Sequence, residues 1–378
     1  MKFIIQRDQL IDNVQHVMKA ISSRTTIPIL TGIKIIATNE GLTFTGSDSD
    51  ISIESFVPKE EDGTELVEIK QSGGVVLNAR FFSEIVRKLP EETVEIEVLG
   101  HHQTIIRSGQ AEFNLNGQDH DEYPHLPQID EKHVFSLQAD LLKTLIRQTI
   151  FAVSTSETRP ILTGVNWEIG KGVLTCAATD SHRLAVRTTP VDIDESIAYN
   201  AVIPGKSLLE LSKILDDTSD LVEIIFTENQ VIFKTKHLLF FSRRLEGNYP
   251  DTSRLIPTDS KTNLVLDSRE FLHAIDRASL LARTEKNNVV KLATVENQTI
   301  EISSNTPEIG NVMEQIKSHS IEGEELKISF SAKYMMDALK ALEGSEVKIN
   351  FTGAMRPFVI QSVGDDTILQ LILPVRTF

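Results

Sequence analysis

Lysine and arginine residues recur at one fixed spacing in three segments of the chain. The three pairs are Arg80 and Arg87, Lys206 and Lys213, and Lys333 and Lys340. Two residues seven positions apart lie two turns apart on the same face of a helix. Paired cations on an exposed helix face bind polyanions such as a phosphate backbone, and they do so without reading sequence.

An acidic residue stands between the two cations each time, namely Glu84, Glu210 and Asp337. The pattern therefore also fits ion pairs within each helix, which contribute about 0.2–0.5 kcal/mol. The charge distribution favours the polyanion surface. The chain carries a net charge of −16, whereas its six expected helical segments hold 17 Lys/Arg and 12 Asp/Glu, a balance of +5 that leaves −21 elsewhere. These segments are 7–24, 78–89, 138–159, 204–216, 268–286 and 331–343.

The first helix of each copy carries a further polar or basic column, formed by Gln15, Arg147 and Arg277. Arg24, expected at the end of the first helix, is another candidate for a phosphate contact. The nine cations form one predicted polyanion-facing set: Arg24, Arg80, Arg87, Arg147, Lys206, Lys213, Arg277, Lys333 and Lys340.

Three motifs that resemble catalytic or ligand sites fail on inspection. "PGKS" at 204–207 lacks the earlier glycine of a phosphate-binding loop, because position 200 is Asn200. "TDSHR" at 179–183 places Asp, Ser and His side by side, whereas a catalytic triad converges from separate segments. His101 and His102 have no spaced metal-ligating partners. We therefore expect no catalytic residue, no metal and no cofactor.

The elements that carry these cations belong to a threefold repeat. "IPILTGIKI" at 27–35 returns as "RPILTGVNW" at 159–167, and the Tyr-Pro pair at Tyr123 returns at Tyr249. A period of roughly 125–132 residues has the size of a domain rather than of a solenoid repeat. The predicted domains are 1–125, 126–252 and 253–378.

Each copy is predicted to be an antiparallel α+β domain with two helices. Apolar residues at helical spacing open each copy, and period-two alternation predicts strands over 41–56, 93–100, 221–235 and 347–351. No apolar run approaches a membrane span and no signal peptide precedes Arg7. Cys176 is the single cysteine, which fits a buried structural thiol and a cytoplasmic protein.

The repeat together with "RPILTG", "TDSHRLAV", "YPDTSRLIP" and the tail "LILPVRTF" resembles the bacterial sliding clamp, the β subunit of DNA polymerase III. The resemblance extends over the whole chain. It implies a head-to-tail homodimeric ring of six domains, with helices around a hole for duplex DNA and sheets outside. It also implies a non-catalytic processivity factor, opened by a clamp loader, that tethers the replicative polymerase to DNA at replication forks.

The resemblance further implies a hydrophobic groove between the second and third domains that takes short linear peptides of partner proteins. Leu184, Leu255, Met355 and Leu373 would form its floor, and His182, Arg183 and Arg254 its polar rim. The full set is Leu162, Thr179, Ser181, His182, Arg183, Leu184, Pro250, Arg254, Leu255, Ser331, Tyr334, Met355, Pro357, Leu371, Leu373, Pro374, Val375 and Arg376.

Several of these residues have a plainer interpretation. The apolar tail is also the pattern of a last strand that closes a sheet, and His182 and Arg183 also fit the surface of a strand end. Two positions depart from the family: Ser181 stands where glycine is frequent, and Asn287 where some members have an aromatic residue.

Ring closure would bring Phe113 and Leu115 of one subunit against Leu280 and Leu281 of the other, by the same resemblance. The alternative is that these four residues belong to the internal core. Two other functions stay open at this stage: a three-domain scaffold that binds only proteins without encircling DNA, and an enzyme working between domains.

Overall fold

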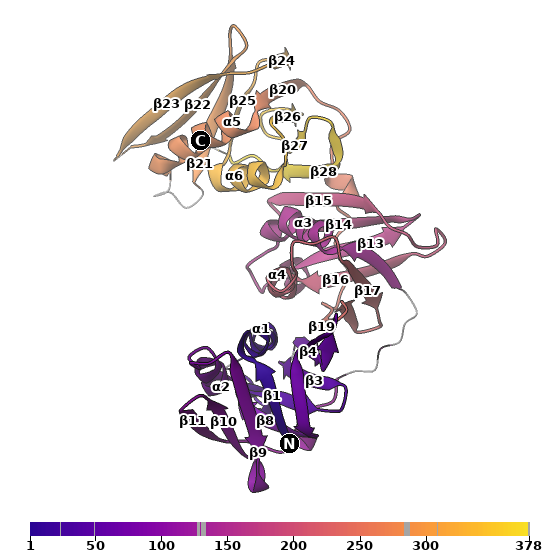
Figure 1. Cartoon of the computed structure of the whole chain (residues 1–378). Helices are drawn as coiled ribbons and strands as arrows, with labels where there is room; N and C mark the ends of the chain where they lie inside the picture. Colours follow the sequence, from indigo (N-terminus) through magenta and orange to yellow (C-terminus); the bar gives the residue numbers. More distant parts are fainter. Residues whose placement is uncertain are drawn as a thin grey trace. The chain divides into compact units, whose positions relative to one another are not determined.

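The computed structural model describes residues 1–22, 24–48, 50–126, 129, 134–282, 288–307 and 309–376 (Figure 1). It combines helices with antiparallel sheets, as predicted. The chain forms two compact units, one made of Met1–Asp140 with Glu210–Arg244 and the other of Leu141–Leu209 with Leu245–Phe378. None of the described helices has the length and apolarity needed to cross a lipid bilayer.

The first unit contains a five-stranded sheet and an eight-stranded sheet. The five-stranded order is β11 (Ala111–Asn116), β10 (Gln103–Ser108), β9 (Thr93–Val98), β1 (Lys2–Gln6) and β7 (Val67–Gln71). The eight-stranded order is β12 (Val134–Gln138), β17 (Leu221–Phe226), β18 (Gln230–Lys234), β19 (Leu238–Arg243), β4 (Ile51–Pro58), β3 (Gly41–Ser47), β2 (Gly32–Ala37) and β8 (Gly73–Asn78). A short hairpin, β5 (Glu60–Glu61) with β6 (Thr64–Glu65), follows β4.

The second unit contains a nine-stranded sheet and a four-stranded sheet. The nine-stranded order is β16 (Tyr199–Pro204), β13 (Gly164–Gly170), β14 (Val173–Thr179), β15 (Arg183–Pro190), β28 (Asp365–Ile372), β27 (Phe358–Ser362), β26 (Glu346–Phe351), β20 (Thr262–Asp267) and β24 (Ser320–Gly323). The four-stranded order is β23 (Gly310–Lys317), β22 (Thr299–Thr306), β21 (Val289–Val295) and β25 (Lys327–Ser331).

Two strand pairings join the sequence repeats into continuous sheets. β19 of the second copy pairs with β4 of the first, where Phe240 faces Ile53. β28 of the third copy pairs with β15 of the second, where Gln370 faces Ala185. We call these pairings the first and second junctions. They explain why the compact units cut through the second copy, and the boundaries at 125 and 252 stay predictions.

Each copy contributes two α-helices to the described structure, as predicted. They are α1 (Arg7–Met18), α2 (Ala79–Val86), α3 (Ala139–Thr149), α4 (Gly205–Ser212), α5 (Ser268–Ala282) and α6 (Ala332–Ala341). The predicted helices were too long, most clearly 138–159. α3 ends at Thr149, whose hydroxyl donates to the carbonyl of Leu145 at 2.8 Å, and a 3₁₀ turn at Ile150–Ala152 follows.

Two predicted strands are in fact hairpins. The stretch 41–56 divides into β3 and β4 because the Asp48 carboxylate accepts the backbone N–H groups of Asp50 and Ile51, each at 2.8 Å. The stretch 221–235 divides into β17 and β18 at Thr227, whose hydroxyl accepts the N–H of Gln230 at 3.1 Å. Side-chain acceptors of this kind offer the backbone a turn in place of a ladder.

The tyrosines of the two Tyr-Pro pairs hold the segments that follow the first and second copies. The Tyr249 hydroxyl oxygen accepts the backbone N–H of Thr179, the last residue of β14, at 2.9 Å. Tyr123 is 1% exposed and packs with Leu30 and Val76. The tyrosine therefore positions the segment in which the groove prediction places Pro250, Arg254 and Leu255.

Candidate functional site

Every residue of the predicted groove lies in the second unit. Its centre is the second junction, where Leu184 of β15 faces Leu371 of β28. Beyond β28 two backbone hydrogen bonds hold the chain. The N–H of Leu373 donates to the carbonyl of His182 at 2.9 Å, and that of Val375 to Ser329 at 2.8 Å. The tail therefore closes the sheet, as its plainer interpretation held, and then continues along the junction.

The apolar residues of the junction form a small cluster whose centre is covered. Leu184 and Leu371 are each 1% exposed, and Ala177 and Val359 are buried with them. The partly exposed residues packed against this centre are Val186, Ile256, Leu369 and Leu373. Leu184 was predicted to form the floor of a groove, but it lies beneath the surface because its side chain packs in this cluster. Leu373 is the predicted floor residue that reaches both the cluster and solvent.

The remaining apolar candidates lie at the surface. Leu255 is 49% exposed and Met355 is 56% exposed. Pro250 lines a cavity of about 800 Å³ together with Val186 and Ile256. This cavity extends along the linker rather than over Met355, so the structure brings only part of the predicted set around one hollow.

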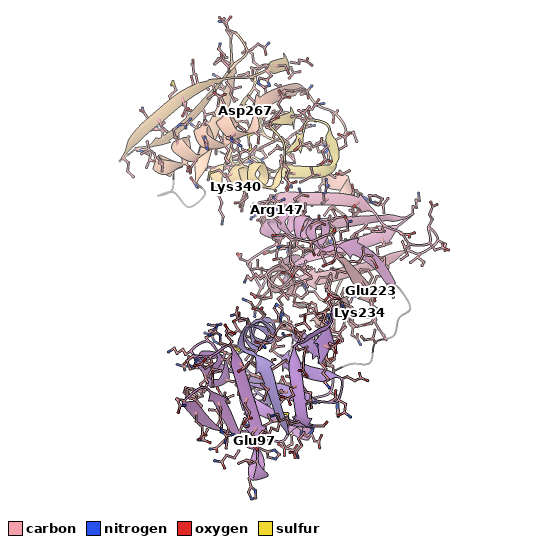
Figure 2. All side chains as sticks on the ribbon, in the orientation of Figure 1. Glu97, Arg147, Glu223, Lys234, Asp267 and Lys340 are labelled. Carbon is pink, nitrogen blue, oxygen red and sulfur yellow. The ribbon has the colours of Figure 1, made fainter. Side chains whose placement is uncertain are left out.

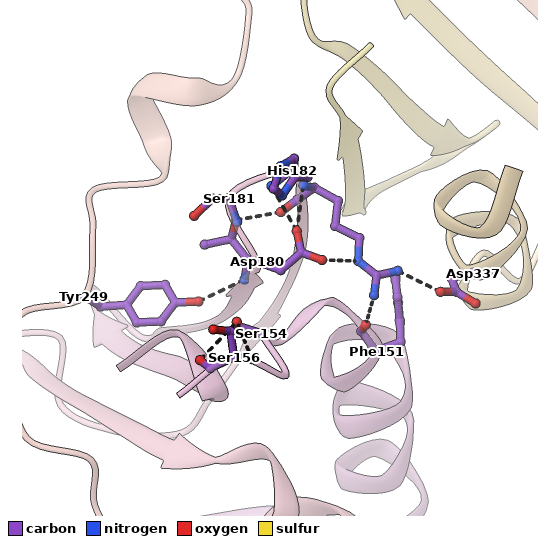
Figure 3. Close-up of polar contacts among 10 residues, drawn as sticks. Phe151, Ser154, Ser156, Asp180, Ser181, His182, Tyr249 and Asp337 are labelled. Atoms are coloured by element: carbon purple, nitrogen blue, oxygen red, sulfur yellow. Dashed lines mark hydrogen bonds and ion pairs between the residues drawn. The ribbon is translucent and has the colours of Figure 1, made fainter. Parts of the chain in front are cut away.

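Arg183 was predicted at the polar rim, and this prediction is wrong because the side chain is only 7% exposed. Its Nε donates to Asp180 at 3.0 Å and its Nη1 to Asp337 of α6 at 2.7 Å (Figure 3). A further N–H donates to the carbonyl of Phe151. The guanidinium carbon lies 4.5 Å from the centre of the Tyr334 ring. Two carboxylates and a carbonyl satisfy the charge, which allows its burial.

This network determines how α6 meets β15. The alternative interpretation of the charge pattern paired Asp337 within its own helix, yet it binds Arg183 across the second junction. Burial raises the pKa of the Tyr334 hydroxyl, and the neighbouring Asp180 carboxylate raises it further. Tyr334 is therefore held as a neutral ring beside the cation.

Ser181 occupies a left-handed backbone conformation with φ of 77°. The Asp180 carboxylate accepts the N–H groups of His182 at 2.9 Å and Arg183 at 3.1 Å, which closes the turn around it (Figure 3). Glycine adopts this conformation without strain, whereas serine does not. The departure from glycine at position 181 is thus a strained turn. The other departure, Asn287, lies outside the described residues.

The other groove candidates differ in exposure. His182 is exposed, as is Arg254, whose Nε binds Asp251 at 2.9 Å. Thr179 is buried and its hydroxyl donates to the Arg183 carbonyl at 2.6 Å. Leu162 and Ser331 are buried, Pro357, Pro374 and Val375 are half-buried, and Arg376 is exposed.

All nine predicted polyanion-facing cations are exposed. Two of the second-helix cations make the ion pairs of the alternative interpretation: Arg80 with Glu84 at 3.4 Å and Lys213 with Glu210 at 2.8 Å. The other four have no hydrogen-bonded or ion-pair partner among the described residues: Arg87, Lys206, Lys333 and Lys340. Lys340 projects from α6 (Figure 2). The ion-pair interpretation therefore applies to Arg80 and Lys213, and the polyanion-facing surface stays a prediction.

The sequence predicted a polar or basic column on the first helices, formed by Gln15, Arg147 and Arg277, and this prediction is wrong for Arg277. The buried residues Leu142 and Ile146 of α3 correspond to Phe271 and Ile275 of α5, which aligns Arg147 with Asp276 rather than Arg277. Arg277 instead donates to Glu314 of β23 at 2.9 Å. Arg147 pairs with Glu343. Arg24 does not end the first helix, since α1 stops at Met18.

The four predicted dimer residues lie at or near the surface. Phe113 is 37% exposed on β11, an edge strand, and Leu280 near the end of α5 is 57% exposed. Leu115 and Leu281 are half-buried. The alternative that all four belong to the internal core is therefore wrong.

Cys176 is fully buried, and burial raises the pKa of its thiol. The prediction of a structural rather than a reactive cysteine agrees with this position, because the thiolate is the reactive form.

Three family models match the chain in sequence. The N-terminal domain of the DNA polymerase III beta subunit matches residues 1–127, its central domain residues 136–251, and its C-terminal domain residues 253–376.

Relatives match over full length. The beta sliding clamps of Bacillus subtilis and Halalkalibacterium halodurans are 67% and 56% identical, each covering 100% of both chains. Among solved structures, the Bacillus subtilis DNA polymerase sliding clamp superposes with a TM-score of 0.98 at 67% identity over 100% of both chains. A sliding clamp from Pseudomonas aeruginosa bound to griselimycin gives 0.93 at 25% identity, again over 100% of both chains.

Proposed function

The chain belongs to the DNA polymerase III beta subunit family, and from this premise we propose how it works as a sliding clamp. Two copies close head to tail into a ring around duplex DNA. The ring has no catalytic residue and acts in the cytoplasm, at replication forks. It holds the replicative polymerase and other partners to DNA through the groove at the second junction, and a clamp loader opens it.

The observation that supports closure is the equal register of the two junctions. β4, β15 and β23 occupy equivalent places in the three copies, and their third residues are Ile53, Ala185 and Val312. β4 and β15 each pair with the last strand of the next copy. β23 has no such partner among the described strands and ends its sheet.

β11 is the first copy's equivalent of β19 and β28, and it stands at the edge of its sheet with no junction partner among the described strands. Phe113, Phe240 and Gln370 face equivalent residues of the preceding strand, Ile106, Phe233 and Ile360. Phe240 faces Ile53 and Gln370 faces Ala185 at the junctions. If β11 of one subunit pairs with β23 of the other in the register of the two junctions, Phe113 lies opposite Val312, and Glu112 lies opposite Met313. Head-to-tail pairing of this kind closes a ring when the rotation permits it.

Disulfide trapping tests this register. A chain with Glu112→Cys and Met313→Cys should form two interchain bonds per ring under mild oxidation, because facing residues of paired strands meet disulfide geometry. The control is Glu112→Cys with Gln315→Cys, which shifts the second thiol by two residues. The buried Cys176 should not interfere. Equal trapping in both chains, or none in the first, would contradict the register.

The exposed cations support the DNA role. Duplex DNA carries about one negative charge per 1.7 Å of axis, so a few scattered cations attract it without a fixed register. Lys206, Lys333, Arg87 and Lys340 are the strongest candidates because neither an acid nor another described group neutralises them. The acidic remainder of the chain repels DNA from other surfaces.

We assign peptide binding to the surface around Leu373, Val186 and Ile256, which continues into the cavity beside Pro250. An apolar surface bordered by a few polar groups is a usual site for a short linear motif. The griselimycin complex of the Pseudomonas aeruginosa relative supports ligand binding in this family. Titration of a labelled Gln-Leu-X-Leu-Phe peptide against the ring tests the assignment.

A further inference from the structure

A cavity of about 670 Å³ lies in the first unit, beside the first junction and separate from the groove. Its walls come from α1, the end of β4, the loop after α4, and the start of β17. Its lining includes the apolar side chains of Leu66, Leu238 and Leu221. Leu221 is 63% exposed, so the cavity offers a large uncovered apolar side chain.

Acidic and basic side chains make up much of the remaining lining. Asp12 and His16 come from α1, and Asp216 and Asp220 come from the loop after α4, while Lys236 and His237 both bind Glu61. Burial lowers the pKa of His16, while the charges of Asp12 and Asp216 act in the opposite direction, which places both carboxylates near its ring. Neither Asp12 nor Asp216 has a hydrogen-bonded or ion-pair partner among the described residues.

The second junction shows what an equivalent carboxylate binds. Asp216 follows Lys206 by ten residues, as Glu343 follows Lys333, so the two acids are counterparts. At the second junction Glu343 binds the guanidinium of Arg147. The residue of α1 that corresponds to Arg147 is Gln15, as the buried pairs Leu10 with Leu142 and Val14 with Ile146 show. The first junction therefore keeps the acid but lacks the cation.

We propose that this cavity binds a peptide segment of a partner protein through an arginine and a neighbouring apolar side chain. The guanidinium takes the place that Arg147 fills at the second junction, between Asp12 and Asp216, and the apolar side chain packs on Leu221. Arginine suits the site because its planar fork donates to two carboxylates at once. The site is independent of the groove at the second junction.

The probe is a fluorescein-labelled peptide with the sequence Gly-Arg-Leu-Leu-Gly, titrated by anisotropy against the full-length protein. Its twin carries citrulline in place of arginine, which keeps the shape and removes the charge. We expect the citrulline peptide to bind the unaltered protein about tenfold more weakly than the arginine peptide does, because one charge-assisted hydrogen bond is removed. The Asp216→Asn variant should bind the arginine peptide more weakly by a similar factor. Asp8→Asn, an exposed acid of the same helix outside the cavity, should bind as the unaltered chain does.

The Gln15→Arg variant gives the sharpest test. It supplies the missing cation from the chain itself, so peptide binding should be lost, whereas Gln15→Ala should leave it unchanged. Gln15 is exposed, so both variants should fold. Three results would overturn the proposal. The first is normal peptide binding by Gln15→Arg, and the second is equal affinity for the arginine and citrulline peptides. The third is no detectable binding at about 1 mM protein, which means a binding free energy weaker than about −4 kcal/mol. Binding lost in Leu373→Lys but kept in Gln15→Arg would assign the peptide to the groove instead, and would also overturn it.

Discussion

The Nη1 atom of Arg183 lies 2.7 Å from an Asp337 carboxylate oxygen, and this contact joins the second and third copies of the repeat. Arg183 stands at the start of β15, and Asp337 lies in the middle of α6. Because Tyr334 precedes Asp337 by one turn and stacks on the same guanidinium, the pair sets the position of the helix beside the groove.

Removing Asp337 should therefore destabilise the protein far more than removing its counterparts. We expect Asp337→Ala to lower the free energy of unfolding by about 3 kcal/mol, because a buried guanidinium loses one of its two carboxylates. Glu84→Ala, the equivalent exposed position in the first copy, should cost at most about 0.5 kcal/mol. Urea unfolding of the two variants measures the difference. Similar losses would show that the Arg183 network does not stabilise the junction.

Replacing Ser181 by glycine should stabilise the protein. The residue adopts φ of 77°, which costs a non-glycine residue about 1 kcal/mol. The greater freedom of glycine in the unfolded chain offsets part of that gain. Thermal unfolding of Ser181→Gly should show a higher midpoint than the unaltered chain, and Ser181→Ala should show no gain. A lower midpoint for the glycine variant would mean that the serine side chain makes stabilising interactions of its own.

The unpaired cations should govern the salt dependence of DNA binding. Lys206→Glu with Lys333→Glu should reduce affinity for duplex DNA and lower the slope of log K against log salt by about 0.9 for each phosphate that is no longer neutralised. The matched control is Lys59→Glu with Lys171→Glu, which changes net charge equally at two exposed lysines outside the helices. If both double variants lose affinity alike, net charge rather than the helix faces attracts the DNA.

The groove is best tested at Leu373 rather than at Leu184. Leu184 is 1% exposed inside the sheet, so a lysine there would unfold the junction as well as block a ligand. Leu373→Lys places the charge on the half-buried edge of the same cluster. A Gln-Leu-X-Leu-Phe peptide should lose about 2 kcal/mol of binding free energy, as for an interface hot spot. Normal dimer mass is the control, and unchanged peptide affinity would place the site elsewhere.

The repeat in sequence was sufficient to predict two helices per copy and the cations that they expose, since both follow from residue spacing. Spacing does not show where a local acceptor turns the backbone, so the hairpins at Asp48 and Thr227 were missed. Nor does it show which side chains meet across a junction. Arg183 was placed at a solvent-exposed rim because its partner Asp337 lies 154 residues away. Arg277 was wrongly aligned with Arg147, because only the burial of the neighbouring helix residues shows that Asp276 is the equivalent position.

Topological retention on DNA tests the account most directly. The protein is loaded by a clamp loader onto a nicked circular plasmid and separated from free protein at high salt, after which half of the sample is cut once with a restriction enzyme. A closed dimeric ring should stay on the circle and leave the linear molecule, because only topology holds it when salt screens the cations. Equal loss from both DNAs, or equal retention on both, would contradict encirclement and favour a protein-binding scaffold.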